Sequence, residues 1–228
     1  MNAFDLIIFD FDGTIVDSAS GIAQCMAAAF ERHHLPPPLS SDVRARIGLT
    51  LEESIRQMTD GLSDLEVAAL ARQYRELHAS VAAPAIALFP GATETLAALV
   101  TDHRLVVVSQ KARRGLLQLM EQLDIQRYFD LVLGSDDVTV LKPDAALYER
   151  HIAPRYPVAR TRILVVGDTA TDLHFAANIG ASGCWAEYGY GDERRCRALS
   201  PVYTVADITE VTSVCAISPA GPRLVSRP

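Results

Sequence analysis

The sequence predicts an α/β fold, in which helices cover a doubly wound parallel sheet and a small all-helical module follows the first strand. Three observations lead to this prediction. Short apolar runs alternate with helical patterns along most of the chain, as they do in α/β domains. These runs are continuous, which is typical of parallel strands that are buried on both faces. The alternation stops between residues 17 and 88, where we find only helical patterns.

Five apolar runs are expected to form the strands of the sheet. They are residues 6–9, 105–108, 131–133, 163–166 and 184–186. Helical patterns separate them: one face is marked by Leu116, Met120 and Leu123, and further helices are expected over residues 145–156 and 171–179. Proline is favoured at the first position of a helix and glycine just after its end. We therefore expect Pro143 at the first position of one helix and Gly180 at the end of another.

The inserted module is expected to be helical throughout. Apolar residues recur at helical spacing in residues 22–30 and 70–81. Two pairs, Thr50 with Glu53 and Ser63 with Glu66, are capping-box signatures. We therefore expect a core made of residues 1–16 and 89–217 and a helical cap of residues 17–88. Residues 218–228 are rich in Ser, Pro and Gly and are expected to form a flexible tail.

The composition excludes several classes of protein. A chain of 228 residues with 49% hydrophobic residues can bury a sizeable core. Its net charge of −7 and the lack of a Lys or Arg run give no reason to expect nucleic acid as a partner. No basic leader and no apolar run of about 20 residues is present, which favours a cytoplasmic protein without membrane contact. The four cysteines form no CxxC pair and are expected to be reduced. Monomer and homodimer both stay open.

Polar side chains follow the expected strands where each strand ends. They are Asp10 and Asp12 after the first strand, Ser109 and Gln110 after the second, Lys142 at the helix start after the third, and Asp168 and Asp172 after the fourth. In open α/β sheets, ligands bind at the carboxyl ends of the strands. We therefore expect these side chains to converge on one site.

The residue types at this expected site suit phosphate chemistry. Alternate residues of an extended chain point the same way, so Asp10 and Asp12 can face one pocket. Carboxylates gathered in one place repel each other unless a cation is present, and an oxygen-only ligand set beside phosphate favours Mg²⁺. A lysine at a helix start, such as Lys142, is unfavourable unless it faces anions. The hydroxyl of Ser109 and the N–H groups after it are natural donors to phosphate oxygens.

With these motifs in this order, the sequence resembles the haloacid dehalogenase superfamily of phosphatases. The motifs are Asp10-Phe11-Asp12-Gly13-Thr14, Ser109 at a strand end, Lys142-Pro143, and Gly167-Asp168 through Asp172. The resemblance runs from about residue 4 to residue 208. Residues 48–54 and 188–191 look similar to the phosphoglycolate phosphatase-like branch, which has a helical cap after the first motif. The resemblance implies a Rossmann-like core and a Mg²⁺-dependent phosphatase that forms an aspartyl-phosphate.

The resemblance also implies a role for each motif residue. Asp10 would attack phosphorus, and Asp12 would protonate the leaving oxygen and then activate water. Mg²⁺ would be held by the Asp10 side chain, the Asp12 backbone carbonyl and Asp168, while Asp172 would support the metal shell or orient Lys142. Phosphate would be bound by Ser109, Gln110 and Lys142. Many relatives have Asn where this chain has Gln110, so the contact of that side chain with the substrate stays open.

Several activities remain compatible with these residues. The leading hypothesis is hydrolysis of a small phosphorylated metabolite such as phosphoglycolate, and a pyrophosphatase or nucleotidase would use the same machinery. The resemblance makes a phosphomutase less well supported, because the sugar phosphomutase branch usually has a lysine in its cap and this cap contains none. A non-catalytic phosphate-binding regulator and a two-component receiver domain are disfavoured by the intact motifs and by the inserted module. Three cap arginines, Arg44, Arg46 and Arg56, are candidate specificity residues, whereas Trp185 and residues 188–191 are expected to serve packing or loop roles.

Overall fold

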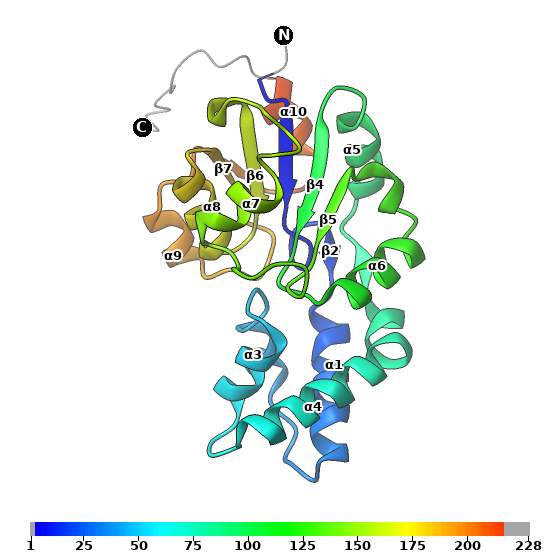
Figure 1. Cartoon of the computed structure of the whole chain (residues 1–228). Helices are drawn as coiled ribbons and strands as arrows, with labels where there is room; N and C mark the ends of the chain where they lie inside the picture. Colours follow the sequence, from blue (N-terminus) through cyan, green and yellow to red (C-terminus); the bar gives the residue numbers. More distant parts are fainter. Residues whose placement is uncertain (1–2, 217–228) are drawn as a thin grey trace.

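The computed structural model describes residues 3–216 (Figure 1). It has a central sheet with helices on both sides, and a separate group of helices beyond the ends of the strands. The predicted tail of residues 218–228, and residue 217 at the end of the predicted core, lie outside the described residues.

The central sheet has six strands in the order β5-β4-β1-β6-β7-β8. All neighbouring strands are parallel. The strands are β1 (Leu6–Phe9), β4 (Arg104–Val108), β5 (Leu131–Leu133), β6 (Ile163–Gly167), β7 (Ser182–Ala186) and β8 (Tyr203–Val205). The chain builds outward from β1 in one direction and then in the other, so the topological switch point lies beside β1. Ligands of doubly wound sheets bind at such a point.

All five predicted strands are confirmed, and so is the α/β fold class. The central strand β1 is buried along its whole length, as its unbroken apolar sequence predicts. The edge strand β8 was not predicted. It has three residues, of which the middle one, Thr204, is exposed, and so it presents no continuous apolar run.

Helices cover the two faces of the sheet (Figure 1). They are α5 (Ala92–Leu99), α6 (Arg113–Gln122), α7 (Ala145–His151), α8 (Ala170–Ile179), α9 (Glu193–Ala198) and α10 (Glu210–Ala216), with short 3₁₀ turns at Gln126–Tyr128 and Arg160–Arg162. Helix α8 ends at Gly180, which has a φ of 72°, so the predicted glycine stop is confirmed.

Helix α7 begins at Ala145, as predicted, but the predicted place of Pro143 and the predicted end of the helix were wrong. Asp144 is its N-cap, and the Asp144 side chain accepts a hydrogen bond from the Ala146 N–H, so Pro143 precedes the cap instead of occupying the first helical position. Aspartate is a strong N-cap, which explains why the first helical position follows Asp144 and is not Pro143. The helix ends at His151 rather than Tyr156, because Pro154 has no N–H with which to continue it.

The helices of the inserted module lie together at the carboxyl ends of the strands (Figure 1). They are α1 (Ala19–Arg32), α2 (Ser40–Arg44), α3 (Leu51–Met58) and α4 (Asp64–Leu77), followed by a π-helical turn at His78–Ala82 and a 3₁₀ turn at Ala83–Ala85. The predicted capping box of Ser63 and Glu66 is confirmed. At Thr50 the N-cap is confirmed, since its side chain accepts from the Glu53 N–H, but the Glu53 carboxylate accepts from Gln57 instead of completing a box. We call this module the cap.

Two short antiparallel strands join the cap to the core. They are β2 (Val16–Asp17) and β3 (Ala87–Leu88). The sequence predicted no strand between residues 17 and 88, because a two-residue strand is too short to produce a pattern. The division of the chain at residues 17 and 88 stays a prediction.

Residues 3–216 also contain information on membrane-spanning helices and on the cysteines. Within that range, no helix combines the length and the hydropathy that crossing a bilayer requires. All four cysteines lie within it as free, buried thiols. Burial raises the pKa of the Cys25 thiol to about 12, so this cysteine stays protonated and unreactive at neutral pH.

Candidate active site

The predicted site residues meet at the carboxyl ends of three neighbouring strands. Asp10 follows β1, Ser109 follows β4, and Asp168 follows β6. All three side chains are buried. Their meeting is a consequence of topology, because β4 and β6 pair with β1 on its two sides.

Lys142 links two of the predicted carboxylates. Its ammonium group donates to Asp10 Oδ1 at 2.9 Å and to Asp172 Oδ1 at 2.6 Å. The three side chains are each at most 6% exposed. Burial alone would lower the pKa of Lys142, but the two carboxylates raise it above its ordinary value. Lys142 is therefore a permanent positive charge in the site.

Three carboxylates form a compact oxygen cluster. Asp10, Asp168 and Asp172 each offer an oxygen, and these atoms lie within 4.8 Å of one another. Burial and repulsion from Asp172 raise the pKa of Asp10 to about 7, against the opposing effect of Lys142. Burial and repulsion from Asp10 and Asp172 raise the pKa of Asp168 well above its ordinary value. One ammonium does not compensate three buried carboxylates, so the cluster fits a bound hard cation such as Mg²⁺.

Asp168 is held in place from several sides. Its Oδ1 accepts from Thr14 Oγ1 at 3.2 Å, and its Oδ2 accepts from the Tyr190 N–H at 2.7 Å. Its backbone carbonyl accepts from Trp185 Nε1 at 3.0 Å. The sequence assigned Trp185 and residues 188–191 only packing or loop roles. The structure shows that this segment fixes a carboxylate of the cluster.

The backbone at residues 13 and 189 approaches Asp168 closely because both residues are glycines. A Cβ atom added at Gly13 would lie 2.4 Å from Asp168 Oδ2, and one added at Gly189 would lie 2.2 Å from Asp168 Cβ. No real side chain tolerates such distances. The two glycines at residues 189 and 191 were the signal in the sequence that could have revealed this contact.

Asp172 has two functions at the start of helix α8. Its Oδ2 accepts from the Thr169 N–H at 3.1 Å and from Thr169 Oγ1 at 2.7 Å, which completes the first turn. Its Oδ1 faces Lys142. The helix start therefore fixes the orientation of the carboxylate that positions Lys142.

Asp12 lies apart from the carboxylate cluster. Its Oδ2 lies 3.2 Å from the Lys111 ammonium, and its buried Oδ1 has no hydrogen-bond partner among residues 3–216. The structure therefore does not bring the Asp12 side chain into the three-carboxylate group, and a contribution of its backbone carbonyl to a metal site stays a prediction. The sequence alone did not predict a role for Lys111. The available signal was rarity, since Lys111 and Lys142 are the two lysines among 21 basic residues.

The two remaining phosphate-site candidates line the cavity beside Asp10. Ser109 Oγ accepts from the Lys111 N–H at 3.1 Å, which leaves its hydroxyl proton available to a ligand. The Gln110 amide donates to the Lys142 carbonyl at 3.3 Å. Gln110 Oε1 is buried and has no partner within the described part of the chain.

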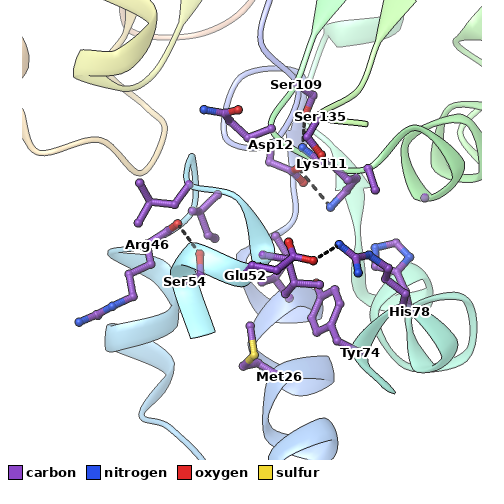
Figure 2. A pocket seen from close by; sticks show the side chains of 18 of the residues that line it. Asp12, Met26, Arg46, Glu52, Ser54, Tyr74, His78, Ser109, Lys111 and Ser135 are labelled. Atoms are coloured by element: carbon purple, nitrogen blue, oxygen red, sulfur yellow. Dashed lines mark hydrogen bonds and ion pairs between the residues drawn. The ribbon is translucent and has the colours of Figure 1, made fainter. Parts of the chain in front are cut away.

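A cavity of about 620 Å³ lies between the cap and the strand ends (Figure 2). Asp10, Asp12, Ser109, Gln110 and Lys111 line it on the core side, and residues of α1, α3, α4 and the loop at Gly48 line it on the cap side. This volume is typical of a site for a small organic ligand.

Of the three cap arginines predicted to select the substrate, Arg46 lines this cavity. Arg46 donates to the backbone carbonyls of Asp42 and Gln57. Arg44 lies elsewhere, with its guanidinium 4.4 Å from the centre of the Tyr190 ring. Arg56 forms an exposed ion pair with Asp64 at 3.0 Å. The structure therefore brings only Arg46 of this trio to the cavity.

Comparisons with known proteins agree with this geometry. Residues 7–186 match the family model described as haloacid dehalogenase-like hydrolase. The chain is 32% identical to the probable phosphatase IndB of Dickeya dadantii, over 90% of this chain and 91% of that protein. It is also 32% identical to the phosphoglycolate phosphatase of Escherichia coli K12, over 83% of this chain and 85% of that protein.

Solved structures show the same fold. The crystal structure of a predicted phosphoglycolate phosphatase from Haemophilus somnus superposes with a TM-score of 0.84 at 24% identity, covering 94% of this chain and 99% of that one. The family model spans most of the chain and includes both the β1 motif and the Asp168 motif. The chain therefore belongs to the haloacid dehalogenase-like hydrolases, in the phosphoglycolate phosphatase-like branch, and is a phosphatase that acts on phosphoric monoesters.

Proposed function

We propose that the protein is a Mg²⁺-dependent phosphatase that hydrolyses a small, phosphoglycolate-like metabolite through an aspartyl-phosphate on Asp10. The observation that carries this proposal is the bridge from Lys142 to Asp10 and Asp172 inside a buried cluster of carboxylates. The phosphoglycolate phosphatases among the relatives support the substrate class.

In the first step, a carboxylate oxygen of Asp10 attacks phosphorus and the bond from phosphorus to the ester oxygen breaks. Asp12 gives its proton to that oxygen, which leaves as an alcohol. Asp12 suits this role because it lines the cavity and has an oxygen without a hydrogen-bond partner in residues 3–216. The product of the step is an aspartyl-phosphate on Asp10.

In the second step, Asp12 takes a proton from a water molecule, and the water oxygen attacks phosphorus. The bond between phosphorus and the Asp10 oxygen breaks, inorganic phosphate leaves, and the Asp10 carboxylate is restored. The same residue thus acts as acid in one step and as base in the next.

Three features position the phosphoryl group. The Lys142 ammonium favours the ionised form of Asp10. It would also offset negative charge on the phosphoryl oxygens. The Ser109 hydroxyl and the backbone N–H groups after it are available as donors. Mg²⁺, held by Asp10, Asp168 and the Asp12 carbonyl, would neutralise negative charge on the transferred group.

The test is phosphate release from a panel of compounds, with Mg²⁺ or with EDTA. The panel contains phosphoglycolate, other small phosphate esters, nucleoside monophosphates, pyrophosphate and p-nitrophenyl phosphate, so it also separates a nucleotidase or a pyrophosphatase. We expect Mg²⁺-dependent release that Asp10→Asn lowers by at least about a thousandfold. The exposed Asp60→Asn is the control. Release that continues in EDTA, or in folded Asp10→Asn protein, would contradict the proposal.

A further inference from the structure

We propose that Lys111 and His78 form the subsite that binds the carboxylate on the leaving group of the phosphoglycolate-like substrate. This inference rests on the proposed function and names two residues that select its substrate. It assigns a role to two cavity residues, one from the core and one from the cap, that the two chemical steps do not use.

The position of Lys111 carries the first part of the argument. Its ammonium lies 3.2 Å from Asp12 Oδ2, and both side chains are 11% exposed. Asp12 protonates the ester oxygen in the proposed mechanism, so a leaving group must extend from Asp12 into the space beside Lys111. In glycolate, the carboxylate is attached directly to the carbon that bears the ester oxygen. A carboxylate at that place lies within reach of a lysine ammonium that contacts Asp12.

His78 faces the same space from the cap. It begins the π-helical turn at His78–Ala82, and such turns occur often at functional sites. The ring lines the cavity (Figure 2), is 6% exposed, and has a buried Nε2 without a hydrogen-bond partner among the described residues. Burial and the Lys111 charge lower the pKa of His78 to about 4. The neutral ring can therefore donate one N–H to an anion beside Lys111.

The other cationic residues of the cavity are less suited to this role. Arg75 is paired with Glu52 at 2.6 Å, and Arg46 donates to two backbone carbonyls of the cap. Arg72 and Arg114 are exposed at the cavity lining. Lys111 is more buried than these two arginines and contacts the proposed acid, so a carboxylate next to the ester carbon meets Lys111 first.

The cavity sets a limit on the rest of the leaving group. Its volume of about 620 Å³ exceeds what glycolate needs, and apolar cap residues such as Met26 and Leu51 form part of its wall. Hydroxy acids with a longer carbon chain than glycolate therefore fit as well. The shared feature of the preferred substrates is the carboxylate beside the ester carbon.

The experiment compares two esters that differ in one charge. Values of kcat/KM are measured for phosphoglycolate and for glycolamide phosphate, which replaces the carboxylate by an uncharged amide. The proteins are the natural enzyme, Lys111→Met, His78→Phe and the control Arg114→Met, each checked for folding by circular dichroism. A role of Lys111 confined to orienting Asp12 would lower both values equally, so the ratio of the two values isolates contact with the carboxylate.

We expect the natural enzyme to prefer phosphoglycolate. Lys111→Met should lower this preference at least about tenfold and His78→Phe about threefold, as expected for loss of a charged and a neutral donor. Arg114→Met should keep the preference. Equal use of the two esters by the natural enzyme, or an unchanged preference in Lys111→Met, would overturn the subsite while leaving phosphatase function intact. Failure to hydrolyse either ester or p-nitrophenyl phosphate with Mg²⁺ would instead contradict the proposed function.

Discussion

The Tyr190 hydroxyl donates a hydrogen bond to Asp17 Oδ1 at 2.7 Å, across the junction between core and cap. The Tyr190 hydroxyl oxygen also accepts hydrogen bonds from the N–H groups of Ser18, at 2.7 Å, and Ala19, at 3.1 Å, where helix α1 begins. The Tyr190 backbone N–H donates to Asp168 Oδ2. One residue therefore connects the first helix of the cap with a carboxylate of the proposed metal site.

We predict that Tyr190→Phe lowers the free energy of unfolding by about 2 kcal/mol, because three hydrogen bonds of one hydroxyl are lost and two helix N–H groups lose their partner. Urea denaturation measures this change. Tyr203→Phe is the control, since the Tyr203 ring packs on Phe4 and its hydroxyl has no hydrogen bond within residues 3–216. Equal stability of the two variants would contradict the account of this junction.

Gly13 and Gly61 form a matched pair for testing the approach of the backbone to Asp168. Both have positive φ angles, 83° and 78°, so Ala at either position costs about 1 kcal/mol in backbone conformation. A Cβ at Gly13 would lie 2.4 Å from Asp168 Oδ2, whereas nothing lies within 4 Å of a Cβ at Gly61. We expect Gly13→Ala to lose at least about a hundredfold in phosphate release and Gly61→Ala to stay within about twofold. Similar activities would refute the role given to this contact.

Metal binding should stabilise the fold through the carboxylate cluster. A ligand at a hundred times its dissociation constant adds about 2.7 kcal/mol to the free energy of unfolding. We expect added Mg²⁺ to raise the melting temperature of the natural protein and of the control Asp60→Asn, but not that of Asp168→Asn. An equal Mg²⁺ shift in all three proteins would contradict the site.

His78 should make stability depend on pH. Burial lowers its pKa to about 4 in the folded protein, whereas the unfolded chain takes up a proton near pH 6.5. Between these values the unfolded state binds more protons, so stability is lost as pH falls from 6.5 towards 4. Between pH 7 and pH 5 we expect His78→Phe to lose about 2 kcal/mol less than the natural protein. Urea denaturation at the two pH values measures this difference, and parallel losses would show that His78 does not have a lowered pKa.

The strands of the core could be predicted because burial on both faces leaves a continuous apolar run, as in β1 and β6. Strand β8 could not, since its exposed Thr204 interrupts the run. The site residues Asp10, Lys142 and Asp168 could be predicted to meet, because parallel strands place their ends at one edge of the sheet.

Residues whose positions depend on how the cap meets the core could not be predicted from the sequence. Tyr190 and His78 are placed by contacts between segments distant along the chain, which no local pattern records. Arg44 and Arg56 had suitable charge, but Arg44 lies on the Tyr190 ring and Arg56 pairs with Asp64. A charged residue in the correct module is therefore insufficient to identify a binding residue.

The central claim is that Asp10 carries the phosphoryl group. The most direct measurement quenches the enzyme during turnover of phosphoglycolate with Mg²⁺, reduces it with borohydride, and locates the reduced residue by mass spectrometry of peptides. Borohydride converts an aspartyl-phosphate to homoserine. The account predicts homoserine at position 10 in the natural enzyme and none in Asp10→Asn. Homoserine at another aspartate during turnover would contradict it.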